Sequence, residues 1–177
     1  MQDYFSSLFL SPVDHHSKVF QIVYRETKKY FSEKKSHFLV KGEQLEDFIW
    51  PRGYGVYIIS RLDQTSRRVV YIGMTGKLNQ NGKYKGKQEF KNRFGRYTPY
   101  YFDRSKNLFC FDPEPGKMNG KPDGYKKSYP LKQVQIDCFV CNFEVINQLI
   151  APTYLESFLL QAFLLEHGHL PEANQSF

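Results

Sequence analysis

The sequence predicts an α/β (α+β) fold in which a small three-stranded antiparallel sheet is flanked by helices. Two short runs rich in β-branched and aromatic residues, 53–60 and 68–74, are separated by a polar connection and indicate a hairpin. A third run, 134–145, alternates as a strand does, and residues 153–167 carry a wide apolar arc at helical spacing. The 177 residues are enough for one domain with a sizeable core.

Composition narrows the classes of protein that the chain can belong to. A hydrophobic content of 41% argues against disorder, and a net charge of +7 favours a polyanionic partner such as nucleic acid. The sequence has no run of about 18 apolar residues that would predict a membrane span. Three scattered cysteines are too few for a disulfide scaffold, so a cytoplasmic setting is expected. Cys138 and Cys141 are expected to be buried thiols, because no second pair exists to complete a zinc site.

The chain divides into two predicted units. Residues 1–50 are expected to form a helical extension that packs on the core, with one helix from Lys18 to Tyr30 and a short one from Glu43 to Trp50. Residues 51–177 hold the hairpin, the third strand and the last helix, with an insertion at about 98–133.

The hairpin places two tyrosines on one face of the predicted sheet. With a turn centred on Gln64, Tyr57 and Tyr71 lie directly opposite each other, and the side-chain period of two puts both phenols on the same face. The other face then carries the apolar residues of both strands: Val56, Ile58, Val70 and Ile72. We therefore expect one apolar face and one face with paired phenols.

The segment after the hairpin concentrates positive charge. Residues 77–96 contain one acidic residue and seven basic residues, for a net charge of +6. We interpret this segment as a phosphate-binding surface, and the alternative is a solvated charged face. Phe90, Phe94 and Tyr97 recur at helical spacing, and Arg93 borders their stripe. Arg93 is therefore the first candidate to contact phosphate, and Arg96 is its rival.

The predicted insertion mixes prolines, aromatic residues and lysines. Five prolines and three glycines between residues 98 and 133 exclude long regular elements. Aromatic and basic residues that alternate suit nucleic acid, because rings stack on bases while lysines contact phosphates. A compact loop packed by its own aromatic residues is the equal alternative.

The last predicted helix carries a carboxylate inside its apolar arc. Glu156 lies between Phe163 and Leu160 on the helical wheel, so it is either buried or faces a cleft, and burying an unpaired carboxylate is costly. The structural alternative is a capping box, in which Glu156 bonds the backbone amide of Thr153.

Five features in this order resemble the GIY-YIG nuclease family over about residues 53–174. Gly55-Val56-Tyr57 and Tyr71-Ile72-Gly73 are similar to the signature tripeptides, and Arg93, Glu156 and Asn174 follow at matching places. Two positions depart from the family, because Met74 stands where many members have lysine and Tyr97 where many have histidine. Lys77 is the candidate to replace the lost basic group.

The resemblance implies a role for each matching residue. Glu156 would bind Mg²⁺ or Mn²⁺, Arg93 would stabilise charge on the phosphate, and Tyr57 would accept the proton of the attacking water. Tyr71 would position phosphate or water, and Asn174 would brace the site through hydrogen bonds. The cations around Tyr57 are expected to favour its phenolate.

The sequence therefore predicts a divalent-metal-dependent DNA endonuclease, restriction-like or structure-specific; a restriction-like role would be compatible with a homodimer. The candidate catalytic residues are Tyr57, Tyr71, Lys77, Arg93, Glu156 and Asn174, with the proton acceptor open between Tyr57 and Lys77. The candidate nucleic-acid-binding residues are Lys83, Lys85, Lys87, Lys91, Arg96, Lys126 and Lys127. One alternative is a catalytically silent nucleic-acid-binding module of the same fold. Another is an interaction protein whose basic insertion docks an acidic partner.

Overall fold

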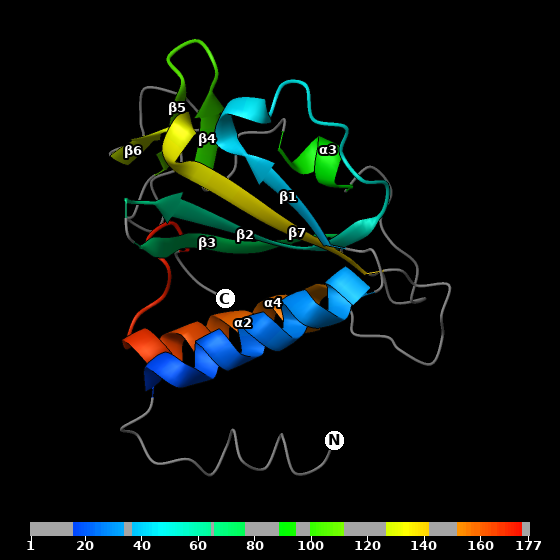
Figure 1. Cartoon of the computed structure of the whole chain (residues 1–177), viewed down its shortest axis with the longest axis vertical. Coiled ribbons are helices and arrows are strands. Elements are labelled where there is room, and N and C mark those ends of the chain that lie inside the picture. Colours follow the sequence, from blue (N-terminus) through cyan, green and yellow to red (C-terminus); the bar gives the residue numbers. More distant parts are fainter. Residues whose placement is uncertain are drawn as a thin grey trace.

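The computed structural model of the chain describes residues 16–33, 37–64, 66–76, 89–94, 100–111, 127–141 and 152–174. Within these ranges the fold is a mixed α+β architecture with two antiparallel sheets (Figure 1). The two longer helices lie on one side of the main sheet, and the second sheet lies on the other side. Of the helices in the described part of the chain, none has the length and the apolar run that a membrane span requires.

The main sheet has four strands rather than the three that the sequence predicts. Their order is β1-β7-β2-β3, with β1 at His37–Lys41, β7 at Val134–Cys141, β2 at Tyr54–Leu62 and β3 at Arg67–Thr75. Strand β1 precedes the hairpin in sequence and pairs with β7. Its central residues, Phe38-Leu39-Val40, are consecutive apolar residues, so no period-two alternation marks them as a strand.

The hairpin register differs from the predicted one. Tyr57 pairs with Gly73, and Tyr71 pairs with Ile59, so the two tyrosines are diagonal neighbours and not direct partners. The register is already offset by one residue at the turn, and a β-bulge next to Ile59 adds a second residue. Two single-residue offsets restore the side-chain parity, and both phenols stay on one face as predicted.

Because of the bulge, the Val70 side chain lies on the other face of the sheet from the predicted one. This side chain belongs to the same core cluster as Tyr57 and Tyr71, whereas the sequence pattern placed it on the opposite face. Val56, Ile58 and Ile72 do lie on that opposite face.

Two helices cover the face that carries Val56 and Ile58. Helix α2 spans His16–Glu33 and helix α4 spans Pro152–His167, both close to the predicted helices, and they pack against each other (Figure 1). Between residues 42 and 50 the predicted helix is replaced by one 3₁₀ turn, η2, at Gly42–Gln44. Pro51 accounts only for the last position of the predicted helix, because a proline disfavours helical dihedrals in the residue before it, Trp50.

The region predicted as an insertion contains a second, three-stranded sheet. Strands β4 (Tyr100–Asp103), β5 (Leu108–Phe111) and β6 (Lys127–Pro130) pair in that order, and the 3₁₀ turn η4 (Leu131–Gln133) follows. The strands are only four residues long, as the prolines and glycines of this segment lead one to expect. Asp103 closes the β4–β5 turn by accepting hydrogen bonds from the Ser105 hydroxyl and the Lys106 amide.

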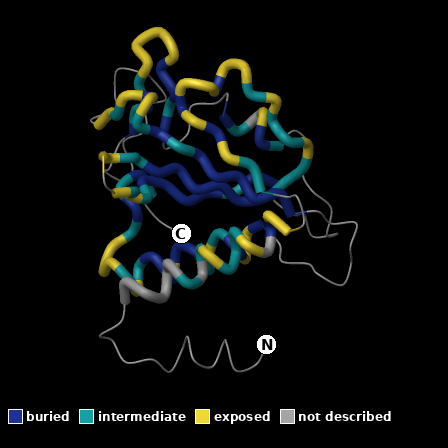
Figure 2. Tube along the Cα trace, viewed as in Figure 1, coloured by how far each residue is buried: buried dark blue, intermediate teal, exposed yellow. Residues whose placement is uncertain are grey.

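Both faces of the main sheet are buried (Figure 2). The face toward α2 and α4 is aliphatic with Phe139, whereas the face toward the second sheet is rich in aromatic rings. The prediction of one apolar face and one face with phenols is therefore incomplete, because the second sheet covers the phenols.

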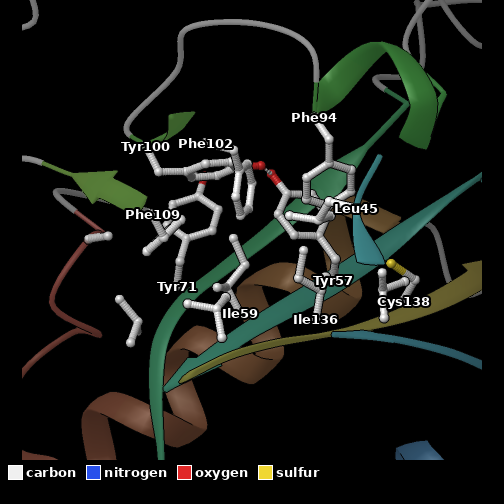
Figure 3. Packing of buried hydrophobic residues seen from close by; sticks show 14 of the residues in the cluster. Leu45, Tyr57, Ile59, Tyr71, Phe94, Tyr100, Phe102, Phe109, Ile136 and Cys138 are labelled. Atoms are coloured by element: carbon white, nitrogen blue, oxygen red, sulfur yellow. Dashed lines mark hydrogen bonds between the residues drawn. The ribbon is translucent and has the colours of Figure 1, made fainter. Parts of the chain in front are cut away.

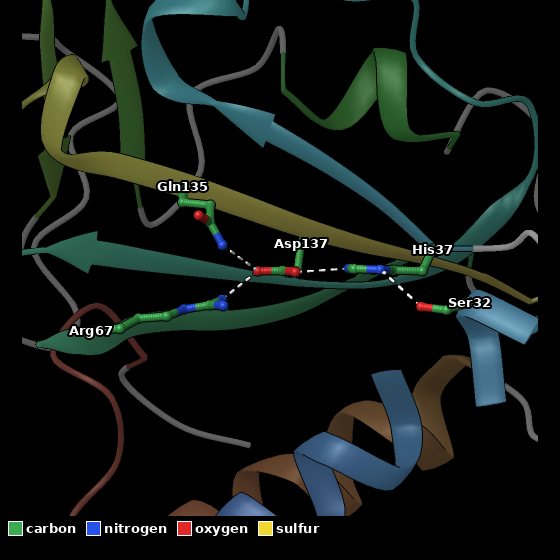
Figure 4. Close-up of polar contacts among 5 residues, drawn as sticks. All are labelled: Ser32, His37, Arg67, Gln135 and Asp137. Carbon is green, nitrogen blue, oxygen red and sulfur yellow. Dashed lines mark hydrogen bonds and ion pairs between the residues drawn. The ribbon is translucent and has the colours of Figure 1, made fainter. Parts of the chain in front are cut away.

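A polar cluster is buried on the helix-facing side of the sheet (Figure 4). Asp137 on β7 is fully buried and bonds His37 Nε2 at 2.7 Å, Gln135 Nε2 at 3.1 Å and the Arg67 guanidinium. His37 also bonds the Ser32 hydroxyl at 3.3 Å. Burial raises the pKa of Asp137, but the hydrogen bond from His37 and the charge of Arg67 outweigh this effect. The pKa of Asp137 is therefore lowered to about 2. Hydrogen bonds of this cluster therefore link α2, β1 and β3, directly or through His37, to one ionised carboxylate on β7.

The substitution Asp137→Asn should lower the free energy of unfolding by about 3 kcal/mol, because it leaves Arg67 without its buried partner. The pKa of about 2 lies below the ordinary value of 3.8. The contribution of Asp137 is therefore complete above about pH 4 and is lost as pH falls toward 2. Urea unfolding at pH 7 and pH 3 measures both effects. The control is Asp63→Asn, which removes a surface ion pair with Arg61 and should cost less than about 1 kcal/mol. Equal losses in the two variants would show that the buried cluster contributes no special stability.

Candidate active site

Tyr57 and Tyr71 lie inside an aromatic cluster between the two sheets (Figure 3). Tyr57 is 0% exposed and Tyr71 is also buried, and their ring centroids are 5.8 Å apart. Phe94 contacts Tyr57 edge-on with centroids 4.8 Å apart, and Trp50 stacks on Phe94 at 4.3 Å. The cluster therefore fixes the orientation of both phenols by packing.

Close contacts require a glycine at two positions, Gly55 and Gly73. A Cβ atom at Gly73 would lie 2.7 Å from the Tyr57 hydroxyl oxygen and would also overlap the Tyr71 ring. A Cβ atom at Gly55 would overlap the Phe139 carbonyl oxygen on the neighbouring strand β7. Gly73 therefore provides the space that the two phenols occupy, and Gly55 allows β2 and β7 to pair closely.

Arg93 reaches the phenols from a short helix. Helix α3 comprises only Phe90–Arg93, and it buries Phe90 while Phe94 follows it into the core. The half-buried Arg93 side chain donates from Nε to the Tyr57 hydroxyl oxygen at 3.1 Å. Phe90 and Phe94 of the predicted apolar stripe are buried, and Arg93 beside them brings its guanidinium to the phenols, whereas Tyr97 lies outside the described residues.

Tyr100 on β4 is a polar contact of the site that the sequence analysis did not single out. Its hydroxyl donates to the Tyr57 oxygen at 2.9 Å, and its side chain is 1% exposed. The available signal was weak, since Tyr100 begins a run of three aromatic residues in a segment where aromatic residues are common. Only the pairing of β4 with β5 shows which of these rings faces inward.

Burial keeps the phenols protonated at neutral pH. Burial raises the pKa of Tyr57 well above 10, with Tyr100 adding to the rise, and the charge of Arg93 opposes this only in part. Burial likewise raises the pKa of Tyr71, and the charge of Glu156 contributes in the same direction. Of the cations expected to favour a Tyr57 phenolate, Arg93 lowers the pKa of that phenol by less than burial raises it, and Lys77 lies outside the described residues.

Glu156 lies in the first turns of α4 and is partly exposed. Its charge is close enough to Tyr71 to raise the pKa of that phenol. Thr153 lies inside the helix, whose first residue is Pro152, and its hydroxyl donates to Met74 Sδ at 3.5 Å. A capping box places its Ser or Thr at the position before the helix, whereas Thr153 is the second residue of α4.

Asn174 binds the outer edge of β3. Its side-chain oxygen accepts a hydrogen bond from the Ile72 amide at 2.8 Å, and its nitrogen donates to the Ile72 carbonyl at 2.7 Å. The Ala173 amide also donates to the Val70 carbonyl at 2.9 Å. The backbone of Ile72, between Tyr71 and Gly73, is therefore bonded by the Asn174 side chain in the way that a neighbouring strand would bond it.

The remaining predicted site residues are dispersed or undescribed. Lys91 is exposed on α3, and Lys127 is exposed on β6 with its Nζ 3.5 Å from Glu172. Six predicted residues lie outside the described part of the chain: Lys77, Lys83, Lys85, Lys87, Arg96 and Lys126.

The aromatic residues of β4 and β5 that were candidates for base stacking instead fill the core: Tyr100, Phe102, Phe109 and Phe111. Cys138 and Cys141 are buried, as predicted, and they belong to the two opposite core clusters.

The described residues contain no group of three or more His, Cys, Asp or Glu side chains that could hold a metal ion. Mg²⁺ in proteins often binds through one or two carboxylates and retains several waters. A single partly exposed carboxylate, Glu156, fits that mode of binding.

Comparison of the chain with protein-family models, with curated proteins and with solved structures finds no match. The geometry of the site is therefore the basis for the function proposed below.

The substitution Gly73→Ala should destabilise the fold by about 1–3 kcal/mol, because the new methyl group displaces both phenol rings. Urea unfolding and the near-ultraviolet circular dichroism of the tyrosines measure these effects. Gly168→Ala is the matched control, since its Cβ meets nothing within 4 Å and only its φ of +71° is strained. It should leave the tyrosine signal intact, and a similarly unchanged signal in Gly73→Ala would refute the steric argument.

Proposed function

We propose that the protein is a divalent-metal-dependent DNA endonuclease that hydrolyses phosphodiester bonds. The observation that carries this proposal is the Arg93–Tyr57 hydrogen bond, with Glu156 close enough to influence Tyr71. Strands β2 and β3 and helix α3 bring two phenols and a guanidinium together, and the charge of Glu156 on α4 acts on one of these phenols, Tyr71. This is a set of groups suited to binding and polarising a phosphate.

Arg93 is the residue that would stabilise charge on the phosphate. Its Nε donates to the Tyr57 hydroxyl, so a two-point contact with phosphate oxygens would come from the terminal nitrogens. Lysine has no equivalent geometry, because its single ammonium lacks the planar array of donors that lets a guanidinium bind a phenol with one nitrogen and a phosphate with the other two.

Tyr57 in this proposal holds Arg93 in place. A phenol whose pKa burial raises well above 10 is protonated at neutral pH and is a poor acceptor for the proton of an attacking water. Lys77 in its neutral form, or hydroxide from solvent, would then take that proton, and Tyr71, whose ring centroid is 5.8 Å from that of Tyr57, would orient water or phosphate.

Glu156 is the residue that would hold Mg²⁺ or Mn²⁺. Such an ion, when bound, supplies charge neutralisation on the phosphate and a more acidic water. Asn174 supports the same region by fixing the backbone of Ile72.

DNA is the favoured substrate because the chain carries a charge of +7, most of it between residues 77 and 96. Exposed Lys91 lies on the same short helix as Arg93, and it would extend the positive surface beside the site. Restriction-like and structure-specific enzymes in the cytoplasm both fit this proposal, and a homodimer is compatible with the former.

Incubation with supercoiled plasmid and with branched DNA, in Mg²⁺ and in chelator, tests the proposal. The wild type should nick DNA only with metal, and Glu156→Gln should reduce nicking by roughly 10²-fold or more while DNA binding persists. Glu26→Gln on α2 is the control, because its partner is the exposed Arg25, and it should cut normally. Salt-sensitive binding without any nicking by the wild type would favour the silent nucleic-acid-binding module.

A further inference from the structure

The Tyr57 hydroxyl oxygen accepts two hydrogen bonds, and only the one from Arg93 has a part in the function proposed above. The second comes from Tyr100 Oη at 2.9 Å, inside a site where both phenols are essentially fully buried. Burying a hydroxyl group costs free energy unless the group forms a hydrogen bond. The buried Tyr100 hydroxyl has such a bond, and the question is what this bond contributes to the site.

The packing of the second sheet does not require that hydroxyl. Four buried rings lie on β4 and β5, and three of them are phenylalanines: Phe102, Phe109 and Phe111. Tyr100 pairs with Phe111 across the strands and contacts Phe102 and Phe109 at centroid distances of 5.6 Å each. Phenylalanine would fill the same space, yet the ring that reaches Tyr57 is the one that carries an oxygen (Figure 3).

We infer that Tyr100 is a positioning residue that acts through Tyr57 on Arg93. Its hydroxyl fixes the Tyr57 oxygen from one side while Arg93 Nε binds that oxygen from another, so the guanidinium is held in a single orientation. The inference rests on the proposed endonuclease function for its effect on cleavage, but the restraint on Arg93 is a property of the folded protein alone.

The surroundings of Tyr100 favour a fixed support over a removable cover. Its ring contacts Tyr71 at a centroid distance of 4.9 Å in addition to the two phenylalanines, and β4 is paired with β5 along its whole length. A ring enclosed on several sides in this way has a defined orientation.

The test uses Tyr100→Phe, which keeps the ring and removes the hydroxyl. The kcat for plasmid nicking should fall about 5- to 10-fold, as expected for one lost hydrogen bond, while KM for DNA stays unchanged. Exchange of the Arg93 Nε–H with solvent, followed by ¹⁵N NMR and assigned with Arg93→Lys, should accelerate by a similar factor.

Two further variants separate positioning from general loosening of the core. Tyr129→Phe removes another hydroxyl of the second sheet, which donates to Glu172 at 2.8 Å, and should change neither kcat nor Arg93 exchange. In a Tyr57→Phe background, Tyr100→Phe should have no additional effect on kcat, because its influence passes through the Tyr57 oxygen.

Several outcomes would overturn the inference. Arg93 exchange that is unchanged in Tyr100→Phe, an equal defect in Tyr129→Phe, or additive defects in the double variant would each reduce Tyr100 to a packing residue. A faster enzyme after Tyr100→Phe would show that Tyr100 covers the site instead of supporting it. If the wild type cuts no DNA, the proposed function fails, and the exchange measurement still decides whether Tyr100 restrains Arg93.

Discussion

The hydrogen bond from Arg93 Nε to the Tyr57 hydroxyl joins the two halves of the candidate site. It links a four-residue helix to the centre of the main sheet, across a cluster of aromatic rings that excludes water. Hydrogen bonds to a charged group are stronger than those between neutral groups, particularly at low local dielectric. The same exclusion of water keeps Tyr57 protonated, so the phenol serves better as an acceptor for Arg93 than as a base.

The sheet that carries Tyr57 is stabilised from both faces and from one edge. On the helix-facing side, Asp137 connects β1, β3 and β7 through a buried ionised cluster. On the opposite side, the second sheet packs its aromatic rings against the phenols. At the edge, Asn174 takes the place of a further strand beside Ile72, which protects β3 from pairing with another chain. Tyr71 and Gly73 therefore lie on a strand that has packing or hydrogen-bonding contacts on both faces and at its outer edge.

The sequence could predict the features that depend on local periodicity. The hairpin, helix α4, the shared face of the phenols and the place of Arg93 beside an apolar stripe all follow from spacing along the chain. Strand β1 was not predicted, because its apolar residues are consecutive. The displacement of Val70 was not predicted either, because a single bulged residue has no signal in the composition of the strand. Tyr100 was missed because its role depends on a strand pairing distant from Tyr57 in sequence.

The most direct measurement compares metal-dependent plasmid nicking by Arg93→Lys with that of the wild type. Lysine keeps the positive charge and much of the length, but it lacks the Nε donor for Tyr57 and the planar fork for phosphate. We expect DNA affinity within about twofold of the wild type and a cleavage rate lower by roughly 10²-fold. A folded Arg93→Lys protein that nicks plasmid at the wild-type rate would contradict a site built around the Arg93–Tyr57 contact.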